Sequence, residues 1–139
     1  MKNSIFLLII LLLFCGCKKE NTPTEVLDEK VSAAAFVKAG GNFTNGPYGM
    51  VTGLAKVYME AEVLKLAFED FSSTNGPDLK VYLSKDINPV DFIYLGDLKS
   101  VSGNQLYTIP AGTIAKDYKY ALVYCQRYKH LFGSAELKF

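Results

Sequence analysis

The sequence of 139 residues contains no tryptophan, one histidine and three cysteines. It therefore lacks the set of His and Cys ligands that an ordinary zinc site uses, and it has no C-x-x-C-H motif for covalent attachment of haem. Fifteen Lys and Arg residues stand against fourteen Asp and Glu residues, and the two signs alternate along the chain. This near-neutral balance argues against nucleic acid as a partner, because nucleic-acid-binding proteins carry a basic patch or stripe.

Motifs of the common enzyme classes are also absent. No Gly-rich phosphate loop precedes a helix, no nucleophile elbow occurs, and no pair of carboxylates stands out as an acid and a base. We therefore do not expect an ordinary hydrolase, and it stays open whether the protein is an enzyme. Half of the residues (50%) are apolar, which suffices for the core of one domain.

The longest apolar run is too short to cross a bilayer. It extends over ten residues, from Ile5 to Phe14, whereas a membrane-spanning helix needs about twenty. A run of this length after Lys2 is typical of a signal peptide. Gly16 followed by Cys17 resembles a bacterial lipobox, in which the cysteine is acylated and becomes the first residue of the mature protein. The alternative is an ordinary secreted protein in which Cys17 is a spare thiol.

The residues that follow Cys17 are polar and predict a tether between a membrane and a folded domain. We predict a signal peptide over residues 1–16, the lipidated Cys17 with a flexible tether over 17–33, and a folded domain over 34–139. The expected partner is the membrane, reached through the acyl chains. By resemblance to the sorting rule of Gram-negative lipoproteins, Lys18 implies the outer membrane of the cell envelope, and the leaflet stays open.

Short segments of alternating apolar and polar residues predict an all-β domain. In one example, Leu64, Leu66 and Phe68 alternate with polar or small residues, as in a strand buried on one face. Seven or eight such strands indicate an antiparallel β-sandwich or a small barrel. The candidate strands are 55–60, 64–69, 79–84, 92–95, 105–109, 118–125 and 134–139.

Turn residues separate these segments. Residues 59–62 can close a tight hairpin, and Asn75, Gly76 and Pro77 form a turn cluster within 72–78. The stretch 27–38 is ambiguous, because it fits either a short helix or a packed edge of the sheet.

Three short motifs follow one another from Phe68 onward: FEDFSSTNGPDLKVYLS, LGDLKSVSGNQLYTIP and YALVYCQRYKHLFGSAEL. Together they resemble the DM-thirteen (DM13) family, which is named for electron transfer, and the resemblance covers residues 41–139. The matching positions are Gly76, Pro77, Asp78, Leu79, Tyr82, Leu83, Gly96, Leu98, Lys99, Gly103, Tyr107, Pro110, Cys125, Phe132, Gly133 and Ala135.

The resemblance implies a redox role, although most of these positions also have a structural explanation. Asp78 is expected to accept backbone N–H bonds within its turn, and Gly96 and Gly103 are expected where a side chain would not fit. One departure is visible: Tyr48 stands where many members of the family have a histidine.

Cys125 is the residue to which we assign the redox chemistry. Once Cys15 leaves with the signal peptide and Cys17 is acylated, Cys125 is the remaining free thiol. It could form a mixed disulfide with a partner, be oxidised to sulfenic acid, or ligate a metal or a noncovalent haem. The alternative is structural, because Ala121 and Val123 share its side of a predicted strand and form a small apolar face.

The neighbours of Cys125 in the sequence fit both a redox role and a structural role of this residue. Arg127, Lys129 and His130 would promote the thiolate if they folded back over it, whereas a surface loop of solvated charges would not. No metal site and no cofactor follow from the residues, since His130 is the single imidazole.

Tyr118, Tyr120 and Tyr124 are predicted on one face of the strand that contains Cys125. They form either a core stripe or an exposed row suited to sugar stacking or electron transfer. The alternative function is therefore a non-catalytic β module that binds a glycan or a protein at the cell envelope.

Overall fold

The computed structural model describes residues 22–139. The predicted signal peptide and Cys17 lie outside these residues. No helix in the described part of the chain is long and apolar enough to cross a membrane.

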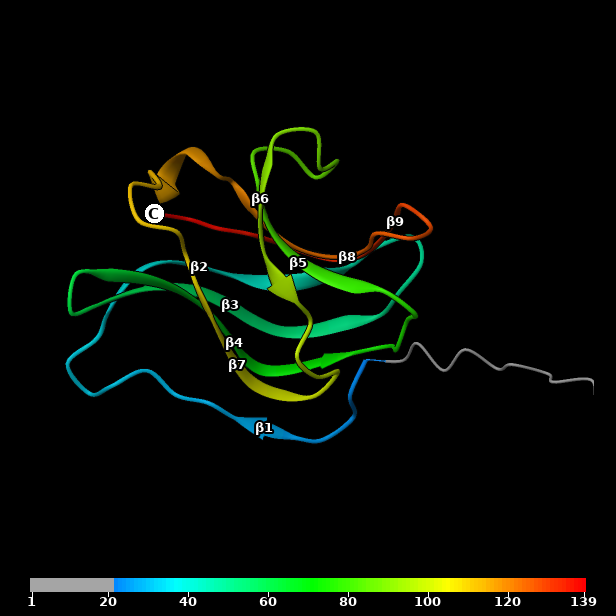
Figure 1. The fold of residues 1–139 in the computed structure, drawn as a ribbon, viewed down its shortest axis with the longest axis horizontal. Coiled ribbons are helices and arrows are strands. Elements are labelled where there is room, and N and C mark those ends of the chain that lie inside the picture. Colours follow the sequence, from blue (N-terminus) through cyan, green and yellow to red (C-terminus); the bar gives the residue numbers. More distant parts are fainter. Residues whose placement is uncertain (1–21) are drawn as a thin grey trace, which may run out of the picture.

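One nine-stranded sheet makes up the fold (Figure 1), in the order β1-β7-β4-β3-β2-β9-β8-β5-β6. The pairing of β1 with β7 is parallel, and the other pairs are antiparallel. The strands are β1 (Leu27–Asp28), β2 (Phe36–Asn45), β3 (Val51–Glu60), β4 (Val63–Ser73), β5 (Leu79–Ser84), β6 (Phe92–Asp97), β7 (Gly103–Thr108), β8 (Tyr120–Cys125) and β9 (His130–Glu136).

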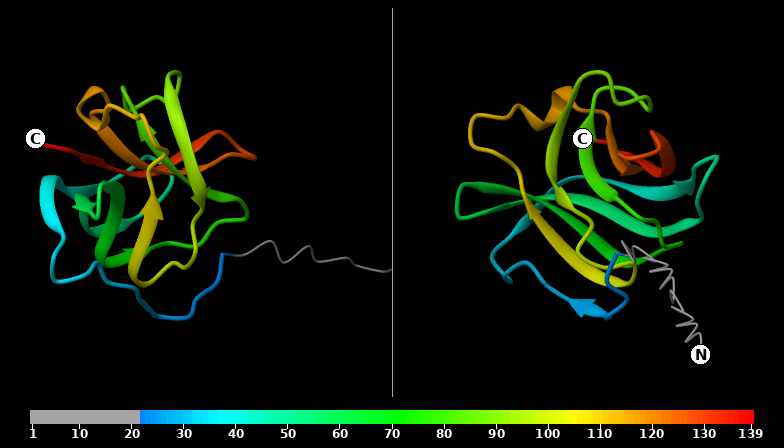
Figure 2. Two further views of the ribbon diagram at one scale, coloured as in Figure 1. Left: turned by 60° about the vertical axis from the view of Figure 1, so that its left-hand side comes forward. Right: turned by 45° about the vertical axis from the view of Figure 1, so that its right-hand side comes forward.

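The sheet curls into a half-barrel, so that its two halves face each other across the core (Figure 2). Every second side chain along a strand points into the core. Leu66 and Phe68 of β4 are fully buried, as are Val81 and Leu83 of β5. The prediction of an all-β fold is confirmed, because a strand that buries one face needs this period of two residues.

All seven predicted strands are present, with ends that differ by a few residues. The predicted hairpin at 59–62 is also confirmed, since β3 ends at Glu60 and β4 begins at Val63. Ala61 and Glu62 form its turn with φ angles of 47° and 65°. A turn with two positive φ angles matches the twist of the paired strands, which is why it closes a two-residue hairpin.

The structure decides between the two alternatives for the stretch 27–38, which contains no helix: β1 at the edge of the sheet and the start of β2 occupy it. The prediction for the tyrosines is wrong. Tyr118 follows a short 3₁₀ turn, η1 (Ala115–Asp117), and packs against the core, whereas Tyr120 and Tyr124 lie on the other face of the sheet. The three tyrosines therefore do not form one row, because the turn changes the alternation before β8 begins.

The segment before β2 is attached to the sheet. The Thr22 N–H donates to Asn75 Oδ1 at 3.0 Å, and Asn75 Nδ2 donates back to the Thr22 carbonyl at 2.8 Å. The Val101 N–H donates to the Pro23 carbonyl at 2.9 Å, and Leu27 pairs with Gly103. Within the stretch 17–33, residues 22–27 are thus attached to the loop after β4, to the loop before β7 and to β7 itself.

Gly103 is the position where this attachment is closest. Its φ angle is 95°, and a Cβ atom there would lie 2.0 Å from the Leu27 carbonyl oxygen, as predicted for a position without space for a side chain. We expect Gly103→Ala to lower the free energy of unfolding by at least about 2 kcal/mol, since backbone strain and displacement of β1 act together. Chemical denaturation measures this loss.

Gly112→Ala is the matched control. The φ angle of Gly112 is 82°, but no atom lies within 4 Å of its Cβ position. In this variant backbone strain alone should lower the free energy of unfolding by about 1 kcal/mol. Equal losses in the two variants would show that the contact with Leu27 adds nothing.

Candidate functional site

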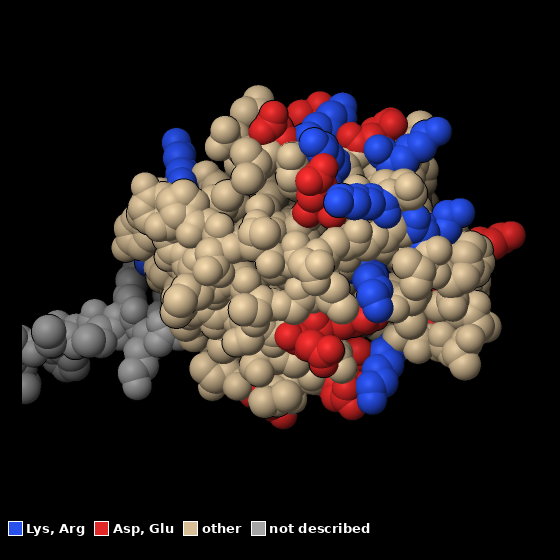
Figure 3. Space-filling view, turned by 180° about the vertical axis from the view of Figure 1, so that it is seen from behind, with Lys and Arg blue, Asp and Glu red and all other residues tan. Residues whose placement is uncertain are grey.

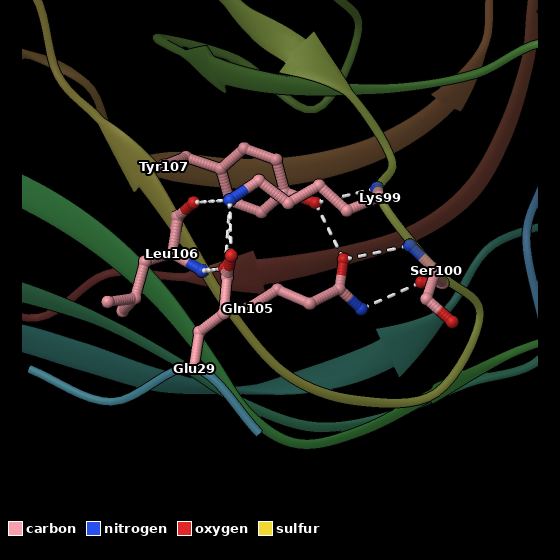
Figure 4. Close-up of polar contacts among 6 residues, drawn as sticks. All are labelled: Glu29, Lys99, Ser100, Gln105, Leu106 and Tyr107. Atoms are coloured by element: carbon pink, nitrogen blue, oxygen red, sulfur yellow. Dashed lines mark hydrogen bonds and ion pairs between the residues drawn. The ribbon is translucent and has the colours of Figure 1, made fainter. Parts of the chain in front are cut away.

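The motif segment that precedes and includes β7 forms a buried polar network (Figure 4). Gln105 is fully buried, and its Nε2 donates to the Ser100 carbonyl at 2.7 Å. Its Oε1 accepts from the Ser100 N–H at 3.2 Å and from the Tyr107 hydroxyl at 2.7 Å. The Tyr107 hydroxyl in turn accepts from the Lys99 N–H at 3.1 Å. The amide of one side chain thus satisfies both backbone polar groups of Ser100, in the connection between β6 and β7.

Lys99 links this network to the N-terminal segment. Its Nζ donates to both carboxylate oxygens of Glu29, at 2.8 and 3.0 Å, and to the Leu106 carbonyl at 2.6 Å. Glu29 Oε2 also accepts from the Leu106 N–H at 2.7 Å. Burial favours the neutral form of Glu29, but the hydrogen bonds from Lys99 and Leu106 outweigh it and hold its pKa below the usual value.

These contacts assign a structural role to Lys99 and Tyr107, two of the matching motif positions. Burial raises the pKa of Tyr107 well above its ordinary range, so that its hydroxyl stays protonated as a hydrogen-bond donor. Sequence analysis did not identify Gln105 or Glu29 as important. A lone glutamine at an inward position of a predicted strand is the signal that could have found the first.

Cys125 lies at the end of β8 with its side chain in the core. It is 0% exposed and clusters with Ala121 and Val123, as the shared alternation predicted. Its register partners are Leu79 on β5 and His130 on β9. The thiol is the free cysteine of the described chain, and it is enclosed by apolar neighbours rather than open to solvent.

The Gly76–Asp78 turn closes over the same end of the core. A Cβ atom at Gly76 would lie 2.9 Å from side-chain atoms of both Leu79 and Phe132, so the turn packs directly on them. Asn75, rather than Asp78, accepts the turn's backbone bond, from the Gly76 N–H at 2.7 Å. The Asp78 carboxylate instead pairs with Lys80 at 2.9 Å. The prediction for Asp78 is therefore wrong, because the neighbouring strand supplies a cation.

The side chain of His130 lies against Tyr48 rather than over the thiol. The two rings stack with their centroids 3.6 Å apart and an interplanar angle of 3°, and the Tyr128 ring lies 5.9 Å from His130. Within residues 22–139 no side-chain hydrogen bond joins His130 to Cys125. The structure thus brings His130 and Cys125 together in register, but not as an acid–base pair.

Among the described residues there is no group of three or more His, Cys, Asp or Glu side chains that could hold a metal ion. The donor set around Cys125 is one thiol and one imidazole, and that imidazole is stacked on a tyrosine.

A second aromatic group lies on the outer face of β5, β6 and β8. The Tyr82 ring lies 4.3 Å from Phe92, 6.2 Å from Tyr94 and 5.6 Å from Tyr124. Phe92 and Tyr94 are exposed, whereas Tyr82 is buried beneath them. Asp97 accepts hydrogen bonds from Lys80 at 2.6 Å and from the Tyr94 hydroxyl at 2.5 Å. We call these four rings the outer aromatic group.

Comparison with known proteins confirms the resemblance. The model of the family described as "Electron transfer DM13" matches residues 42–137, which is more than half of the chain. Neither the curated proteins nor the solved structures contain a significant match. The matched segment begins within β2 and ends just after β9, and it includes Cys125 and the network around Gln105.

The Glu29–Lys99 pair predicts a pH-dependent contribution to stability. Because folding lowers the pKa of Glu29, its contribution is present above about pH 4.5 and is lost as the pH falls through the folded-state pKa. We expect Glu29→Gln to be less stable than the unmodified protein at pH 7, and the difference to shrink below pH 4.5. Thermal unfolding across this range measures it.

Lys99→Met provides the control. In that background the pH dependence of the Glu29→Gln difference should change, because the Lys99 ammonium that lowers the pKa of Glu29 is gone while burial and the Leu106 N–H remain. An unchanged pH profile in the Lys99→Met background would contradict the assignment.

Proposed function

Because the chain belongs to the DM13 family of electron-transfer domains, we propose that it is a redox domain that is held at the outer membrane through Cys17 and reacts through Sγ of Cys125. The observation that carries this proposal is the family match together with the position of the thiol. Cys125 lies within the matched segment and is the cysteine of the described residues. Cys15 and Cys17 precede that segment and belong to the proposed signal and anchor.

The reaction that a single thiol can perform without a bound cofactor is exchange with a disulfide of a partner. The Cys125 thiol loses its proton to solvent, and the thiolate attacks one sulfur of the partner's disulfide. A bond forms between Sγ and that sulfur, the partner's S–S bond breaks, and the other sulfur leaves as a thiolate. The partner disulfide is the oxidant. In the reverse step the partner's thiolate attacks its own sulfur in the mixed disulfide, which re-forms the partner's S–S bond and releases the Cys125 thiolate.

Access to the thiol requires local opening, since Cys125 is 0% exposed. The turn between β8 and β9 is the weakest cover. The Gln126 N–H donates to the Asp78 carbonyl at 3.1 Å, the Lys129 N–H donates to Gln126 at a long 3.4 Å, and Lys129 has a φ angle of 54°. Hairpin ends with few backbone hydrogen bonds open at a lower free energy than the whole domain. We assign the gate to this turn.

The outer aromatic group supports a second candidate function, which is glycan binding. Phe92 and Tyr94 are exposed on the edge strand β6, and a charged set lies beside them. In that set Lys80 is paired with both Asp78 and Asp97, so that fixed hydrogen-bonding groups border apolar rings. Rings next to fixed polar groups suit the apolar face and the hydroxyls of a sugar.

We expect the native Cys125 thiol to react with an aromatic disulfide reagent at least about a thousandfold more slowly than in denaturant, since opening must come first. The reaction of the native thiol should still be faster than a reaction that requires unfolding of the whole domain. The absorbance of the thiolate released from the reagent measures the native and the denatured reaction rates, with the acylated protein. The same measurement on Cys125→Ala gives the background absorbance change.

Two results would contradict the redox assignment. One is a native rate that equals the rate of global unfolding, which would make Cys125 a packing residue. The other is capture of the same disulfide-linked envelope partner by Cys125→Ala as by the unmodified protein.

For the second candidate, Tyr94→Ala should weaken binding to envelope polysaccharide by about tenfold, since it removes an exposed ring of the outer aromatic group. Phe36→Ala is the control, because Phe36 is exposed to a similar degree on β2 but lies outside this group. Equal affinity of the two variants in calorimetric titration would exclude this site.

A further inference from the structure

Three exposed side chains and one imidazole gather at one end of the molecule. Tyr48, Met50 and Tyr128 are 56%, 65% and 57% exposed, although residues of this kind are usually covered. The His130 ring stacks on the Tyr48 ring with centroids 3.6 Å apart, and the Tyr128 ring lies 5.9 Å from His130 at an angle of 33°. We call these four residues the aromatic rim.

Backbone hydrogen bonds between two turns hold the rim in shape. The Gly46 N–H donates to the Phe132 carbonyl at 2.7 Å, and the Tyr48 N–H donates to the Leu131 carbonyl at 3.3 Å. The turn before β3 is thus fixed to the start of β9. The part of the rim formed by Tyr48 and His130 is therefore preformed, and binding to it would cost little ordering of the backbone.

The N-terminal segment leaves the folded domain at the same end. Met50 and Thr74 exchange hydrogen bonds, at 3.1 Å to the Thr74 hydroxyl and at 2.9 Å between backbones. The next residue, Asn75, holds Thr22. Figure 1 shows the turn after β2 and the turn before β9 on one side of the molecule.

The length of chain between Cys17 and Thr22 limits how far the rim can lie from a bilayer. Five residue steps separate these positions. Fully extended, they span at most about 18 Å. If Cys17 carries the acyl chains, the end of the domain that holds Thr22 must therefore lie close to the lipid surface.

The charge of the rim matches such a surface. The segments 46–50 and 126–133 contain no Asp or Glu, and the second contains Arg127 and Lys129. On the face shown in Figure 3, blue and red groups gather over part of the surface, and the rest presents mainly uncharged side chains. Tyrosine is favoured at the membrane interface, and Lys and Arg are attracted to anionic headgroups.

We propose that the aromatic rim is a membrane-docking surface, which seats the domain on a lipid bilayer with anionic headgroups. Tyr48, Met50 and Tyr128 enter the interface, and Lys129 lies among the headgroups. This rests on the proposed anchor at Cys17, because the short link is what brings the rim to the bilayer. The lipid anchor alone would leave the orientation of the domain free.

The absence of tryptophan from the sequence makes a direct test possible. Tyr128→Trp introduces a single fluorescent reporter into the rim, and Phe36→Trp introduces a matched one at 56% exposure. Phe36 begins β2, and the turn that bears Tyr48 follows the end of this strand, so the two ends are about 30 Å apart. The full-length acylated protein is reconstituted into vesicles of phosphatidylethanolamine and phosphatidylglycerol.

A lipid with a spin label near its headgroup should quench Tyr128→Trp at least about twice as strongly as Phe36→Trp. Adding Lys129→Glu should reduce the quenching of Tyr128→Trp on these vesicles, but not on vesicles of phosphatidylcholine. Circular dichroism checks that each variant keeps its β-sheet spectrum.

Equal quenching of the two reporters in acylated protein would overturn the rim and leave the anchor standing. Absence of acyl chains on Cys17, measured by mass spectrometry of the N-terminal peptide, would overturn the anchor and the rim together. A blue shift of Tyr128→Trp that depends on protein concentration instead of vesicles would assign the rim to a second copy of the chain, which also overturns the proposal.

Discussion

The buried amide of Gln105 is the contact on which the half-barrel depends. A curled sheet must connect the two halves that face each other, and here the chain passes from β6 on one edge to β7 near the other. That connection exposes backbone groups to the core, where an unpaired polar group is costly. One glutamine side chain satisfies both polar groups of Ser100, and Tyr107 extends the network to Lys99. The motif residues of this segment are therefore explained by folding.

The sequence predicted most strands, because the alternation of buried and exposed positions is a local property. Leu66 and Phe68 of β4 carry this signal clearly. It could not predict the pairing of β1 with β7 or the attachment of Thr22 to Asn75, since both depend on partners more than fifty residues away. A polar N-terminal segment therefore looked like a tether, although hydrogen bonds to the sheet hold its second half.

At the candidate site, the inward direction of Cys125 followed from its alternation with Ala121 and Val123. The positions of its neighbours did not. A register shift between Val123 and Tyr124 alters the pairing just before the thiol, and the stacking of His130 on Tyr48 depends on a turn from another hairpin. Asp78 shows the same limit, because the partner of its carboxylate is set by the strand that follows.

The buried thiol of Cys125 and the exposed Tyr128 of the rim belong to the same hairpin, formed by β8 and β9. Cys125 ends β8, and the turn that covers it carries Tyr128. If the rim rests on a bilayer, this turn faces headgroups, so a reactant dissolved in bulk water reaches Sγ less readily than one at the membrane surface. The orientation of the domain on the bilayer then limits which redox partners can reach the thiol. A thiol gated by a membrane-facing turn is suited to a membrane-bound redox partner, whereas a rim that stays in water would leave the same gate open to soluble disulfides.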